Sequence, residues 1–160
     1  MLIRPIRNNE IMLLTEFLYE AIFQRDTSNL AFRTIIQDPS VWIYVDEFGS
    51  KADDHCFVAE LDGKIVGAVW VRCIKAFGHI DDAVPEFAIS VYPQYRGKGI
   101  GTELMRKMLE YLKAKGYART SLAVQKDNYA VKMYQQVGFE ISDENAQEYI
   151  MICMLGDYTK

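Results

Sequence analysis

The sequence has few cysteines and histidines, and none of them has the spacing of a metal site. Its three cysteines, Cys56, Cys73 and Cys153, are far apart, and no two stand in a C-x-x-C pair. The two histidines, His55 and His79, have no ligand spacing with each other or with a cysteine. The pattern argues against a bound metal, and it predicts reduced, buried thiols in a cytoplasmic protein.

Long apolar runs and an excess of basic residues are also missing. No apolar stretch reaches the length that crosses a membrane, and residues 1–7 lack the hydrophobic region of a signal peptide. The formal net charge is −4. We therefore expect neither a membrane partner nor general binding to nucleic acid.

What the chain does have is enough apolar residues for one core. Half of its 160 residues are hydrophobic, without repeats or low-complexity tracts, which predicts a single domain over 1–160. A helical pattern runs from the cap at Asn8-Asn9 to Ile22. Further helical patterns lie at 30–37, 101–115 and 129–137. Strand patterns lie at 2–6, 56–61, 64–74, 86–91, 120–125, 139–142 and 149–155. We expect an α/β (mixed α+β) protein, a twisted mixed sheet of six to seven strands with helices on both faces.

The most informative stretch is the turn between the strand at 86–91 and the helix at 101–115. Glycines recur there at every second position: Gly97, Gly99 and Gly101. Backbone amides at a helix N-terminus, beside Arg96 and Lys98, are suited to hold an anion such as phosphate. The alternative is a turn whose glycines serve tightness alone, but such a turn does not require two flanking cations.

Two common phosphate-binding motifs are absent from this stretch. No P-loop pattern occurs, and a dinucleotide fingerprint that starts at Gly97 fails because its sixth position is Thr102. The remaining pattern, R-x-x-G-x-G over 96–101, resembles the pyrophosphate-binding motif of the GNAT superfamily of acetyl-CoA-dependent N-acetyltransferases. A second run, N-Y-A-V-K-M-Y-Q-Q-V-G-F over 128–139, is similar to another motif of that family. The order of elements extends the resemblance over about 2–155, and it implies a GNAT-like fold.

The resemblance implies acetyl-CoA as cosubstrate, with no metal. The pyrophosphate would lie on the turn, on Arg96, Gly97, Lys98, Gly99, Ile100, Gly101 and Thr102. The strand edge would pair its backbone with the pantetheine arm where two parallel strands splay, at Ile89, Ser90 and Val91. Asn128 would hydrogen-bond the arm from the far side.

Acetyl transfer requires an acid for the departing thiolate and a base for the amine. By resemblance Tyr134 is the acid; the alternative is a tyrosine that only packs in the core. Glu86 is the candidate base, directly or through a water. It shares a strand face with the small Ala88 and Ser90, and we expect this face to leave room for a ligand. The alternative for Glu86 is a solvated glutamate at the end of a strand.

The predicted acceptor is the primary amine of a small molecule or of a peptide. Tyr19, Phe23 and Phe32 are the residues expected to line its site, and ordinary helix packing is the alternative for the first two. A rival hypothesis is a non-catalytic acyl-CoA-binding or sensing domain, and another is an enzyme for a different phosphate ligand. A homodimer is common in such folds by resemblance.

Overall fold

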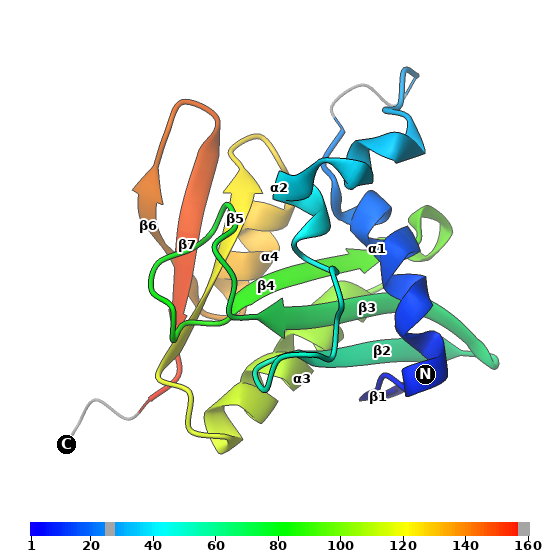
Figure 1. Ribbon diagram of the computed structural model, residues 1–160, viewed down its shortest axis with the longest axis horizontal. Coiled ribbons are helices and arrows are strands. Elements are labelled where there is room, and N and C mark those ends of the chain that lie inside the picture. The colour runs from blue at the N-terminus through cyan, green and yellow to red at the C-terminus, as the bar shows by residue number, and fades with distance from the viewer. Residues whose placement is uncertain (25–27, 157–160) are drawn as a thin grey trace.

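A seven-stranded sheet forms the centre of the computed structural model, which describes residues 1–24 and 28–156 (Figure 1). The strands are β1 (Leu2–Pro5), β2 (His55–Leu61), β3 (Lys64–Arg72), β4 (Glu86–Val91), β5 (Arg119–Gln125), β6 (Phe139–Glu144) and β7 (Glu148–Met154). They lie in the order β1-β2-β3-β4-β5-β7-β6, and β4 with β5 is the parallel pair of the described sheet. The predicted mixed sheet is confirmed, with seven strands.

Helices cover both faces of this sheet, as predicted (Figure 1). One face carries α1 (Leu14–Ala21) and α2 (Pro39–Trp42), and the other carries α3 (Ile100–Ala114) and α4 (Ala130–Gln136). Because successive strand residues point to opposite faces, β3 contributes to both cores. Its Trp70 packs in the core under α1, and its Val69 packs in the core under α3.

The first two helices differ from their predicted extents. The helix expected from Asn8-Asn9 to Ile22 begins as a 3₁₀ helix, Asn8–Leu13, and becomes α-helical at Leu14. Its first turn is held to β1, because the Glu10 carboxylate pairs with Arg4 at 2.8 Å. The helix expected at 30–37 is a short 3₁₀ helix, Arg33–Gln37.

The parallel pair β4–β5 separates almost as soon as it forms. In the described sheet its register consists of Glu86 opposite Ser121, and the Ser121 N–H donates to the Pro85 carbonyl at 3.0 Å. Backbone direction alternates along a strand, so the N–H and C=O groups of Ile89 and Val91 face the same side as Pro85. They therefore face the gap between the two strands, whereas the backbone of Ser90, predicted to lie on the same edge, faces β3 opposite Ala68.

Candidate functional site

A cavity of about 860 Å³ lies where β4 and β5 diverge. This volume is within the range of small-molecule sites, roughly 300–1,000 Å³. Its walls come from the end of α1, β4, the turn before α3, and α4. The sequence-predicted residues that line it are Tyr19, Phe23, Ile89, Ser90, Val91, Arg96, Gly97, Gly99, Ile100, Gly101, Thr102, Asn128 and Tyr134. Three predicted residues are not among its lining residues: Lys98, Glu86 and Phe32.

The turn at 93–99 presents bare backbone to this cavity. Pro93–Tyr95 form a 3₁₀ turn, and α3 then begins at Ile100. Gly97 and Gly99 have φ of 77° and 83°, and a Cβ built on either would meet no atom within 4 Å. Only glycine adopts this conformation at little cost, and the open space beside it leaves room for a ligand. With the free amides of the helix N-terminus, the turn fits the pyrophosphate of a nucleotide-like cosubstrate.

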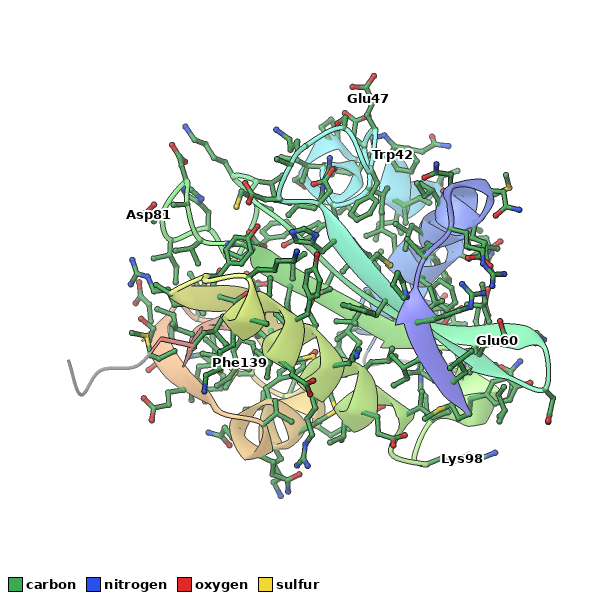
Figure 2. The ribbon with its side chains drawn as sticks, turned by 90° about the horizontal axis from the view of Figure 1, so that it is seen from below. Trp42, Glu47, Glu60, Asp81, Lys98 and Phe139 are labelled. Carbon is green, nitrogen blue, oxygen red and sulfur yellow. The ribbon has the colours of Figure 1, made fainter. Side chains whose placement is uncertain are left out.

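The two cations of the turn have different surroundings. Arg96 Nε donates to the Val91 carbonyl at 2.8 Å, and its guanidinium pairs with the Glu20 carboxylate at 3.2 Å. Arg96 therefore ties the end of β4 to α1 at the cavity wall. Lys98 extends away from the body of the protein (Figure 2), with Nζ 5.6 Å from the centre of the Tyr95 ring.

The opposite wall is the start of α4. The Asn128 side-chain oxygen accepts the Ala130 N–H at 2.9 Å, which fixes the side chain beside the start of α4 and leaves its NH₂ as the remaining donor group. A Cβ on Gly101 would lie 3.4 Å from Met133 Sδ, so a glycine here lets α3 and α4 approach closely. The NH₂ of Asn128 suits the carbonyl groups of a pantetheine arm.

Tyr134 belongs to the same helix and lines the cavity. Its ring packs on Phe139, with centroids 6.1 Å apart. Burial raises the pKa of the Tyr134 phenol to about 12, so the phenol keeps its proton at neutral pH. A protonated phenol beside a ligand cavity can act as a general acid.

Glu86 has a different environment from the one that the sequence indicated. Its side chain is 1% exposed, so the alternative of a solvated glutamate is wrong. The expected free space beside it is filled, because Oε2 accepts hydrogen bonds from the Tyr44 hydroxyl and from the Gly78 N–H, the latter at 2.9 Å. Burial raises the pKa of this carboxyl group above its ordinary value, against hydrogen bonds that lower it. Its role as a base stays a prediction.

The predicted acceptor wall is brought together in part. Tyr19 and Phe23 line the cavity, and the Tyr19 hydroxyl donates to the Ala31 carbonyl at 2.6 Å. The Arg33 guanidinium lies over the Tyr19 ring, 4.6 Å from its centre. Phe32 is 86% exposed and does not line the cavity.

Two contributors were missed by the sequence reasoning. Arg33 lines the cavity, and Tyr44 contacts Glu86 from a segment 42 residues earlier in the chain. No local motif contains either residue. The sequence carries no signal for them, because only the packing of α1 and α2 on the sheet places them there.

Metal-binding clusters and membrane-spanning helices were sought in the described residues, 1–24 and 28–156. These residues contain no group of three or more His, Cys, Asp or Glu that could hold a metal ion. No helix among them is long and apolar enough to span a membrane. The cysteines are free thiols; Cys56 and Cys153 are buried as predicted, whereas Cys73 is partly exposed.

Comparison with known proteins was made against families, curated proteins and solved structures. The model of the Acetyltransferase (GNAT) family matches residues 20–139. An uncharacterised N-acetyltransferase of Methanocaldococcus jannaschii is 39% identical over 92 residues, covering 56% of this chain and 41% of that protein. N-acetylaspartate synthetase of Xenopus tropicalis is 35% identical over 113 residues, covering 69% of this chain and 38% of that protein. The chain thus spans about two fifths of the length of these relatives.

Among solved structures, the fold matches over nearly its whole length. An N-acetyltransferase of Thermoplasma acidophilum, solved in complex with coenzyme A, has a TM-score of 0.70. It is 19% identical, and the match covers 96% of this chain and 98% of that one. At this identity the likeness shows a shared fold.

Proposed function

Because this chain belongs to the acetyltransferase (GNAT) family, we propose that it transfers an acetyl group from acetyl-CoA to a primary amine by direct attack. The observation that carries the proposal is the cavity at the β4–β5 splay. One of its walls is the glycine turn before α3, and the other holds Asn128 and Tyr134. An anion cradle and a proton donor in one cavity are what transfer from a CoA thioester requires.

Different cavity residues bind different parts of acetyl-CoA. The turn amides from Gly97 to Gly101 hold the pyrophosphate, with Arg96 and Thr102 beside it. The backbone of Ile89 and Val91 pairs with the pantetheine amides in the manner of an added strand. Acetyl-CoA supplies the activated acetyl group.

The reaction forms one bond and breaks one. The amine nitrogen bonds to the acetyl carbon as the carbon–sulfur bond breaks, and the sulfur leaves with the bonding electrons. Tyr134 gives its proton to this thiolate, while the amine loses a proton to Glu86. Because the Glu86 carboxyl group is buried outside the cavity lining, the proton reaches it through a water.

The acceptor is a small-molecule or peptide amine. The Xenopus relative is named an N-acetylaspartate synthetase, which makes L-aspartate the first acceptor to test. Arg33 also lines the cavity, but its guanidinium already pairs with the Glu16 carboxylate at 2.5 Å, so the choice of L-aspartate rests on the relative alone. The rival hypothesis, an acyl-CoA sensor without turnover, predicts tight CoA binding and no acetylated product.

The test mixes the protein with acetyl-CoA and each of four amines: L-aspartate, spermidine, L-lysine and an alanine-initiated peptide. Release of CoA thiol, and a product heavier by one acetyl group in mass spectrometry, are the expected results. Tyr134→Phe should lower kcat about 100-fold or more while CoA binding is kept. Tyr117→Phe, which removes a phenol outside the cavity, is the matched control. Binding of CoA without turnover of any amine would favour the sensor.

A further inference from the structure

One oxygen of the buried Glu86 carboxyl group has no hydrogen-bond partner. Oε2 accepts from Tyr44 and Gly78, but Oε1 is buried without any partner among the described residues. Buried polar atoms in folded proteins are nearly always paired, so an unpaired one needs an explanation. Glu86 lies where β4 and β5 part, next to the proposed reaction site. Because Glu86 is not among the cavity-lining residues, a water is needed to link this unpaired oxygen to the cavity.

Tyr44 lies in the turn that follows α2, and β3 holds this turn in place. The Trp70 indole N–H donates to the Tyr44 carbonyl at 3.0 Å. Arg72, 2% exposed, donates to the carbonyls of Ile43 and Asp46, both at 2.8 Å. The segment around Tyr44 is thus bonded to the strand beside β4, on which Arg72 lies directly opposite Glu86. The phenol has little freedom to leave the carboxyl group.

The second partner of Oε2 is equally fixed. A Cβ on Gly78 would lie 2.9 Å from the Ala123 nitrogen, so this position requires glycine. The Ser121 hydroxyl donates to the Gly78 carbonyl at 2.8 Å, which ties the turn to β5. Both partners therefore bind Oε2, and Oε1 stays buried without a hydrogen-bond partner.

We propose that Tyr44 is a positioning residue for acetyl transfer: its phenol fixes Oε2 of Glu86, and Oε1 is left to accept a hydrogen bond from the water that carries the amine proton. The proposal rests on the proposed function, because it takes Glu86 as the base. No local motif predicts this pair, since the two residues meet only in the folded chain.

The pair predicts a pH dependence whose direction follows from its surroundings. Burial raises the pKa of Glu86, whereas the Tyr44 hydrogen bond, the Gly78 N–H, the nearby His79 and the backbone of Ala76 lower it. Arg72 faces the pair from β3, and Glu148 from β7 acts on Tyr44. Removing the phenol takes away a group that stabilises the carboxylate, so Tyr44→Phe should make Glu86 titrate at higher pH.

The first experiment needs no acceptor. Infrared spectra of the whole protein are recorded across pH, and the carboxyl band lost in Glu86→Gln identifies Glu86. In Tyr44→Phe this band should titrate at higher pH than in the unchanged protein. Tyr117→Phe removes a phenol that donates to the Asp53 carboxylate, away from Glu86, and should leave the band where it was. An unchanged Glu86 titration in Tyr44→Phe would overturn the proposal.

The second experiment measures kcat/KM against pH with acetyl-CoA and glycinamide, a primary amine without a carboxylate. Glu86→Gln should lose about 100-fold in kcat/KM together with the acid limb, and Tyr44→Phe should move that limb in step with the infrared titration. If the infrared titration of Glu86 shifts in Tyr44→Phe but the acid limb of the kcat/KM profile does not, the pair has no catalytic role. Failure of every amine to react would instead contradict the proposed function, and the infrared result would still decide whether Tyr44 acts on Glu86.

Discussion

At the scale of single residues, burial changes the chemistry of the two proposed proton-transfer groups in the same direction. Tyr134 and Glu86 both lose hydration, which disfavours their charged forms and raises the pKa of each. For Tyr134 this preserves the proton that an acid must give. For Glu86 it raises the pKa of the proposed base above the ordinary carboxyl value, and it also links the carboxyl group to the stability of the fold.

Stability should therefore depend on pH through Glu86. Its pKa in the folded protein lies above the ordinary value of 4.5, so the unfolded chain releases this proton first as the pH rises. The contribution of Glu86 is fully present below pH 4.5 and is lost as the pH rises through the folded pKa. Urea unfolding at a series of pH values should show this decline in the unchanged protein and not in Glu86→Gln.

The control for this prediction is Glu140→Gln, which changes an exposed glutamate on β6. Its stability should follow the same pH curve as the unchanged protein. A constant difference in the free energy of unfolding between the unchanged protein and Glu86→Gln, at every pH, would contradict the linkage.

At the scale of elements, the turn before α3 joins local backbone geometry to ligand binding. Its two left-handed glycines are the reason why a chain leaving β4 can enter a helix with its amides toward the cavity. A side chain at these positions would cost backbone energy and would also project into the space for the ligand. A glycine that has the same backbone conformation but lies away from the cavity allows the two effects to be separated.

Gly99→Ala should strain the turn by about 1 kcal/mol and should also weaken CoA binding. Gly63→Ala is matched to it, because Gly63 has φ of 79° and no atom within 4 Å of its Cβ position, but lies in the β2–β3 hairpin. Both variants should unfold at lower temperature without ligand. Added CoA should raise the unfolding temperature of Gly63→Ala as in the unchanged protein, and that of Gly99→Ala much less. Equal stabilisation of both would contradict a cradle at this turn.

At the scale of the whole molecule, the sheet separates two apolar cores and also connects them. Residues of β3 alternate between the core under α1 and the core under α3, so neither core can form without the strand that they share. Such an arrangement favours a single cooperative unfolding transition over the loss of one layer at a time.

Leu104→Ala tests this cooperativity. Leu104 is 0% exposed in the core under α3, and its truncation should lower the free energy of unfolding by about 2–5 kcal/mol. Tryptophan fluorescence, which comes from Trp42 and Trp70 in the opposite core, should report the same midpoint as the helical circular dichroism. Leu30→Ala, at a leucine that is 54% exposed, should change stability by about 0.5 kcal/mol or less. Separate midpoints for the two signals would indicate layers that unfold independently.

The sequence by itself determined the features that depend on neighbouring residues. The period of two along β4, the glycines of the turn and the helix at 130–136 are local patterns. With the resemblance to the GNAT motifs, they predicted the cavity residues Ile89, Ser90, Val91, Arg96, Gly97, Gly99, Ile100, Gly101, Thr102, Asn128 and Tyr134. Local patterns failed where distant contacts decide. The first helix begins as a 3₁₀ helix in which Glu10 pairs with Arg4, and the hydrophobic periodicity of the sequence does not predict this pair.

Only the tertiary structure decided what surrounds Glu86. The sequence placed it on a strand face with two small residues, which suggested open space, but Tyr44 and Gly78 fill that space from segments that reach β4 only in the folded chain. The same packing buried the carboxyl group, raised its pKa and left Oε1 without a partner. Burial and hydrogen bonding are sums over neighbours in space, and a sequence lists only neighbours along the chain.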